Sequence, residues 1–148
     1  MNHIHEIQQN GLLWVNVTKQ GEKELDTIGK RFHFQKIDVH ECLPPFQRPK
    51  MVKRPGYYFL VLHFPLFDCG NRRVRFTEVD FFLNPNFLVT VHDGQLPAIR
   101  KFFEECSSQP EFRARLFSGT MAQPLFELLN RLIDAVLPSL LHINEDIN

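Results

Sequence analysis

The sequence predicts a mixed α/β sandwich in which helices cover a largely antiparallel sheet. Strand-like runs cluster in the middle of the chain, and helical periodicity precedes and follows them. The chain has 148 residues, 43% of them hydrophobic and 15 of them Phe, which suits one packed domain and argues against disorder. No repeat of 20–50 residues is visible, which argues against a repeat fold.

Four segments are expected to be strands because they alternate or are rich in β-forming residues. Asp-Cys-Gly-Asn and Asn-Pro-Asn clusters, which favour turns, separate the last three. The expected strands are Leu12–Val17, Tyr57–Phe67, Arg73–Leu83 and Phe87–His92.

The third strand changes phase. The apolar residues in its first half would point to one face of the strand and those in its second half to the other face. Such a switch predicts a bulge or break near Thr77 and Glu78. The fourth strand is expected to lie beside the third, since consecutive strands usually pair.

Five segments have helical periodicity: Glu22–His33, Phe34–Leu43, Gln95–Cys106, Glu111–Phe117 and an apolar stripe from Leu125 to Ile147. Pro44 and Pro45 stop the second of these helices. No stop signal follows the last helix, so the chain is expected to end inside an unfinished element.

Composition narrows the function classes. Lys plus Arg and Asp plus Glu number 17 each, so the chain has no net positive charge that would attract nucleic acid. The three cysteines are odd in number and far apart, which is typical of a reducing compartment. No apolar run is long enough to span a bilayer, and no N-terminal signal is present, so we expect a soluble cytosolic domain.

Enzyme motifs are absent from the sequence. It has no Gly-rich phosphate loop, no G-x-S-x-G elbow and no H-E-x-x-H. Cys42 and His40 lie two residues apart and point to different faces of a helix, so they form no nucleophile pair. We expect neither an enzyme nor an organic cofactor.

Six short strings, in order over nearly the whole chain, resemble the cytosolic domain of the CorA family of divalent-cation transporters. They are Leu13–Val17, Gln47–Lys50, Tyr57–Leu62, Val79–Leu83, Asn86–Gly94 and Leu132–Leu141. The resemblance implies an α/β/α sandwich that leads into a long stalk helix. It divides the chain into an α/β cytosolic domain at 1–118 and the start of the stalk, packed on that domain, at 119–148.

The resemblance also implies a homopentamer on the cytoplasmic face of the inner membrane. Its pore region, marked in the family by a Gly-Met-Asn string, is expected to lie C-terminal to this sequence, which holds no such string. A soluble chain of this kind cannot itself conduct ions, so a sensing role is expected.

Metal binding is the chemistry that the resemblance implies. Regulatory cations in the family sit between subunits, held partly by the Asp of a "LED" string, where this chain has Val39-His40-Glu41. A second family carboxylate corresponds to Asp134. Mg²⁺ takes few carboxylates and keeps several waters, so only one or two residues in a sequence need mark such a site. The imidazole nitrogen of His40 favours Zn²⁺, Co²⁺ or Ni²⁺ over Mg²⁺.

Each of these residues also has a plain structural interpretation. His40 and Glu41 fit a polar C-terminal helix turn, and Asp134 fits a solvated or interface position. His3, His5 and Glu6 fit a frayed terminus better than a metal site, and His92-Asp93 fits a turn.

The expected function is therefore a cation-sensing regulatory domain of a CorA-like magnesium and cobalt transporter, with Mg²⁺ as the regulatory ion and Co²⁺ or Zn²⁺ as alternatives. The same features leave open a zinc transporter of the ZntB branch and a soluble interaction module without a pore.

Overall fold

The computed structural model describes residues 2–68 and 70–147, with side chains described as far as residue 138. Six strands form one sheet in the order β1-β2-β6-β5-β4-β3. The strands are β1 (Ile4–Gln9), β2 (Leu12–Val17), β3 (Lys50–Arg54), β4 (Tyr57–Asp68), β5 (Arg73–Leu83) and β6 (Phe87–Val91). Every neighbouring pair is antiparallel except β2 and β6, which run parallel.

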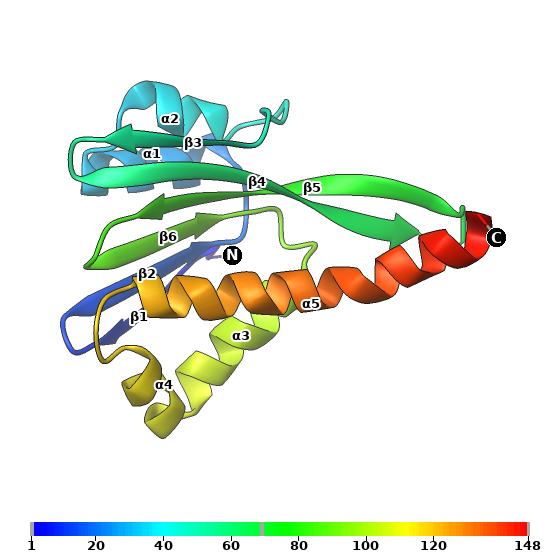
Figure 1. Cartoon of the computed structure of the whole chain (residues 1–148). Coiled ribbons are helices and arrows are strands. Elements are labelled where there is room, and N and C mark those ends of the chain that lie inside the picture. The colour runs from blue at the N-terminus through cyan, green and yellow to red at the C-terminus, as the bar shows by residue number, and fades with distance from the viewer. Residues whose placement is uncertain (1, 69, 148) are drawn as a thin grey trace.

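Helices cover both faces of this sheet (Figure 1). On one face lie α1 (Glu22–Phe32) and α2 (Lys36–Glu41). On the other lie α3 (Pro97–Ser108), α4 (Pro110–Leu116) and α5 (Ala122–Ile147). The α/β/α sandwich is therefore confirmed.

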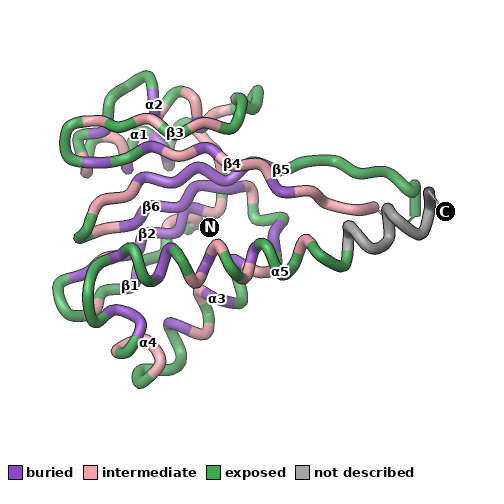
Figure 2. Tube along the Cα trace, viewed as in Figure 1, coloured by how far each residue is buried: buried purple, intermediate pink, exposed green. Residues whose placement is uncertain are grey.

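The sheet separates two apolar cores. The core toward α3 and α5 contains Trp14, Phe81, Phe102 and Leu128, and the core toward α1 and α2 contains Val15, Phe59, Phe82 and Leu25. Burial follows the strand centres, whereas the first residues of β5, at the turn end of the β4–β5 hairpin, are exposed (Figure 2). Such covering of both faces explains why these strands are apolar at nearly every position.

The predicted bulge in β5 is wrong. The β4–β5 register is continuous through His63 opposite Glu78 and Phe64 opposite Thr77. The phase change has another cause: residues 73–76 belong to the exposed hairpin end, whereas residues 77–82 are buried on both faces. Phe82 shares its face with two buried acids, Glu78 and Asp80.

Two edge strands were missing from the sequence prediction. β1 continues into β2 through Asn10 and Gly11, both of which have positive φ, as a type I′ hairpin requires. β3 pairs with β4 through a turn in which Gly56 has a φ of 87°. The polar terminus around His5 is thus an ordered strand.

α5 carries the predicted apolar stripe into the core through Leu125, Leu128 and Leu132. A second set of apolar side chains on α5, namely Phe126, Ile133 and Leu137, is 65%, 55% and 51% exposed. No helix among the described residues combines the length and the hydropathy needed to cross a membrane.

Candidate functional site

The three residues predicted to hold a cation do not meet within one chain. His40 and Glu41 lie in the last turn of α2, whereas Asp134 lies on α5, on the other side of the sheet (Figure 1). His40 and Asp134 are exposed, and Glu41 is mostly covered. In the described part of the chain no three His, Cys, Asp or Glu residues are close enough to hold a metal ion.

Glu41 is already paired with a cationic side chain. Its carboxylate forms an ion pair with Lys50, the first residue of β3, and both side chains are largely covered. A metal ion that binds Glu41 would therefore meet a competing ammonium group. Lys50 was not singled out from the sequence, because a Lys at the end of a turn is ordinarily solvated.

His40 lines an open groove of about 910 Å³ between α1 and α2. The same groove is lined by His33, the residue that ends α1 in a left-handed conformation with a φ of 58°. Lys30 and Asp26 of α1 also line it and form an exposed ion pair. The groove thus presents two imidazoles, of which the sequence analysis had identified one.

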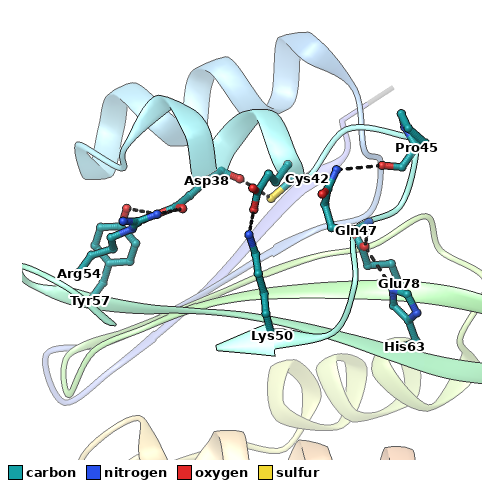
Figure 3. Close-up of polar contacts among 10 residues, drawn as sticks. Asp38, Cys42, Pro45, Gln47, Lys50, Arg54, Tyr57, His63 and Glu78 are labelled. Atoms are coloured by element: carbon teal, nitrogen blue, oxygen red, sulfur yellow. Dashed lines mark hydrogen bonds and ion pairs between the residues drawn. The ribbon is translucent and has the colours of Figure 1, made fainter. Parts of the chain in front are cut away.

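A buried carboxylate anchors α2 to the sheet. Asp38 is completely buried, and its two oxygens accept hydrogen bonds from the Arg54 guanidinium at 3.1 and 2.9 Å. The hydroxyl of Tyr57 donates to Asp38 Oδ2 at 2.6 Å and accepts from the backbone N–H of Gln35 at 3.0 Å. Figure 3 shows these groups meeting between α2 and the β3–β4 hairpin.

Burial, followed by the hydrogen bond to Asp38, raises the pKa of Tyr57 to about 12. The phenol therefore keeps its proton and remains a donor to Asp38. Because a buried carboxylate is stable only when it is paired, Asp38, Arg54 and Tyr57 act as one unit. That unit fixes the helix which carries His40 and Glu41.

A second polar group lies under the C-terminal end of α2. Glu78 on β5 accepts a hydrogen bond from the backbone N–H of Gln47 at 2.9 Å, and His63 Nε2 lies 3.4 Å from its carboxylate (Figure 3). Asp80, two residues further on, is fully buried and lies beside Glu78 and the Cys42 thiol.

Asp80 is held as a neutral acid. Burial raises its pKa to about 9, and the neighbouring charge of Glu78 and a hydrogen bond with Glu78 add to the effect. A protonated Asp80 carries no charge, which explains how this carboxyl persists at a fully buried position.

Cys42 lies against this pair. Its thiol donates to the backbone oxygen of Asp38 at 3.4 Å. Burial, then the charge of Asp80, raises the pKa of the Cys42 thiol well above its ordinary value. Metals bind the thiolate and the carboxylate, so a protonated Cys42 beside a protonated Asp80 is a poor ligand set. We interpret this cluster as a polar support for α2 and not as a metal centre.

Known structures share this fold. The soluble domain of CorA from Methanocaldococcus jannaschii superposes with a TM-score of 0.74 at 19% identity, covering 92% of this chain and 52% of that one. The complete CorA magnesium transporter of the same organism gives 0.73 at 17% identity, covering 99% and 44%. The ZntB cytoplasmic domain from Vibrio parahaemolyticus gives 0.66 at 14% identity, covering 94% and 62%.

At the sequence level, a model of the CorA-like Mg²⁺ transporter protein family matches residues 9–148. The chain therefore belongs to the CorA-like Mg²⁺ transporter family. It is also similar to the putative metal ion transporter YfjQ of Bacillus subtilis (strain 168), with 26% identity over 147 residues. The match covers 98% of this chain and 44% of YfjQ, so the chain spans less than half the length of that relative.

Proposed function

We propose that this chain is the cytosolic cation-sensing domain of a CorA-like transporter of Mg²⁺ and Co²⁺. The observation that carries the proposal is the placement of His40 and Asp134, which are exposed on opposite sides of the same sheet. A cation that needs both positions can use them only if two copies of the chain come together. The regulatory ion then belongs to the contact between subunits.

An apolar surface beside Asp134 supports such a contact. Phe126, Ile133 and Leu137 on α5 are more than half exposed. Large apolar side chains gathered on one helix mark an interaction surface. In a homopentamer a neighbouring subunit covers this surface and brings its own α2 toward Asp134.

The mechanism follows from charge. A divalent cation bridging Glu41 and Asp134 of neighbouring subunits stabilises the closed assembly. When the cytosolic ion concentration falls, the bridge is lost and the carboxylates repel one another, which shifts the population toward the open state. The ion is regulatory, and the domain is neither an enzyme nor dependent on an organic cofactor.

Zinc is the second candidate ion. His33 and His40 line one groove, and imidazole nitrogen suits Zn²⁺ better than Mg²⁺. This arrangement favours a ZntB-like zinc transporter as the alternative identity of the whole protein.

In either case, the proposed place of the domain is the cytoplasmic face of the cell membrane. Its link to the membrane is a pore region C-terminal to these residues.

Cation titration of the full-length protein tests the proposal. Mg²⁺, Co²⁺ and Zn²⁺ are each expected to raise the melting temperature and to stabilise the oligomer, since a ligand that binds only the folded assembly stabilises it by mass action. Glu41→Gln and Asp134→Asn should each reduce the Mg²⁺ shift.

Glu111→Gln is the matched control. It removes one exposed acidic charge from α4, so it should leave the Mg²⁺ shift unchanged. Equal loss in all three variants would mean that Mg²⁺ acts only through net charge, and the proposal would fail.

A further inference from the structure

A chain of buried hydrogen bonds crosses the parallel pair β2 and β6 beneath α3. Trp14 Nε1 donates to Thr90 Oγ1 at 3.0 Å, and Thr90 Oγ1 lies 2.8 Å from Asn16 Oδ1. His92 Nε2 lies 2.9 Å from the same oxygen. All four side chains are buried, Asn16 to within 3% of complete coverage.

The direction of each hydrogen bond is fixed by its partners. The Trp14 indole only donates, so the Thr90 hydroxyl accepts from it and donates its own O–H to Asn16 Oδ1. The backbone N–H of Gly94 donates to His92 Nδ1 at 3.1 Å, which leaves the ring proton of a neutral imidazole on Nε2. Burial lowers the pKa of His92 to about 4, so the ring is neutral near pH 7.

Asn16 is therefore held in one orientation. Its side-chain oxygen accepts from both Thr90 and His92, and its amide nitrogen points away from them. Among the described residues no acceptor bonds this nitrogen. The nitrogen is not one of the fully covered side-chain atoms without a partner among the described residues, so it keeps open surface on which an acceptor from outside the chain can bind.

Asn16 lines a pocket of about 890 Å³ beneath α3. The pocket opens where β2 and β6 end, beside Thr18 and Gly94. Crevices at the carboxyl ends of parallel strands are common ligand sites in α/β proteins. The volume suits a small molecule.

The other walls define the chemistry of the ligand. Arg100 of α3 is exposed at the pocket and supplies a positive charge, and Glu104, one turn further along α3, supplies a negative charge at the same wall. Phe103 of α3 is partly buried and supplies an apolar wall, edge-on to Trp14 at a centroid distance of 5.0 Å. The pocket thus combines a fixed amide donor, a guanidinium and an aromatic surface.

We propose that this pocket binds a small molecule carrying an oxyanion, either a carboxylate or a phosphate, on an aromatic body. The oxyanion accepts from Asn16 Nδ2 and from Arg100, and the aromatic body packs on Phe103. The site lies on the opposite side of the sheet from His40, and it does not depend on the proposed cation sensing.

Titration of the full chain with phenylacetate, phenyl phosphate and benzyl alcohol, followed by NMR, tests this proposal. The two anions should shift the side-chain amide signals of Asn16. Benzyl alcohol lacks the charge and should bind roughly tenfold more weakly, as expected for the loss of a charged hydrogen bond. The tighter of the two anions identifies the oxyanion that the pocket prefers.

Arg100→Gln and Lys101→Gln are the decisive variants, because Asn16→Asp also disturbs the buried hydrogen bonds. Both remove one exposed positive charge from the same helix, but only Arg100 lines the pocket. Arg100→Gln should weaken phenylacetate binding roughly tenfold and Lys101→Gln should not. Equal effects of the two variants, equal binding of benzyl alcohol, or unshifted Asn16 signals with both anions would each overturn the proposal.

Discussion

Lys50 at the start of β3 forms an ion pair with Glu41 at the end of α2, so the carboxylate proposed to bind a cation already has a positive charge beside it. A divalent ion must displace or outcompete this ammonium group. The Lys50–Glu41 pair thus raises the cation concentration that is needed to occupy Glu41.

Removing the competing charge should strengthen cation binding. Lys50→Met keeps the length of the apolar stem and deletes the ammonium group, so the Mg²⁺ concentration at half-maximal thermal shift should fall roughly tenfold, as expected when a close opposing charge is removed. Lys53→Met, on the same edge strand, is the control. If Lys50→Met weakens the Mg²⁺ response instead, Glu41 is not a ligand.

The buried Asp38 should dominate the stability of the α2 anchor. Asp38→Asn keeps the shape but removes the charge that Arg54 and Tyr57 bind, so the free energy of unfolding should fall by about 2 kcal/mol. Tyr57→Phe removes one hydrogen bond and should cost about 1 kcal/mol. Urea denaturation measures both. A smaller loss in Asp38→Asn than in Tyr57→Phe would contradict the assignment of Asp38 as the centre of this unit.

Asp80 should make stability depend on pH. Between the ordinary carboxyl value of 3.8 and about 9, the unfolded chain has released the Asp80 proton and the folded chain retains it. Raising the pH through this window therefore favours unfolding, by up to about 1.4 kcal/mol per pH unit, and the effect levels off above the folded pKa.

Denaturation of the wild type and Asp80→Asn at several pH values measures this contribution. The variant has no carboxyl at this position and should lose the added slope, gaining stability relative to the wild type as the pH rises. Parallel pH profiles of the two proteins would show that Asp80 is ionised in the folded chain.

The exposed apolar side chains of α5 should matter for assembly and not for folding. Ile133→Glu in the full-length protein is expected to lower the oligomer mass measured by light scattering, because a charge would be buried in the subunit contact. Phe76→Glu, at a similarly exposed position on β5, is the comparison. An unchanged oligomer in Ile133→Glu would exclude this surface from the contact.

The central part of the fold was predictable because periodicity reports burial. β2 and β5 occupy the residues expected of them, and α5 follows the predicted apolar stripe. The edge strands β1 and β3 escaped because they are half-exposed and carry polar residues on both sides of the pleat. The Asn10-Gly11 dipeptide was the one local signal that could have revealed β1.

The candidate site was less accessible to sequence reasoning. His40, Glu41 and Asp134 were identified by resemblance, and their role as metal ligands stays a prediction. The burial of Asp38 and Asp80 was not predicted, because a pattern of apolar residues indicates which face of an element is buried but not that a carboxyl group lies on that face. The burial of Asp38 depends on Arg54, which only the folded chain brings close. Asp80 lies two residues from Glu78, but the sequence alone does not show that their shared face of β5 is covered.

Complementation between two variants tests the intersubunit bridge most directly. Glu41→Gln and Asp134→Asn subunits are co-expressed, and mixed oligomers carrying both tags are isolated. Where Glu41 of one subunit type meets Asp134 of the other, an intact pair forms, although no single chain carries both residues. If a cation bridges subunits in this way, mixed oligomers should regain part of the Mg²⁺-dependent thermal shift that is lost in each variant alone. Mixed oligomers that respond to Mg²⁺ no better than either variant alone would contradict the intersubunit bridge.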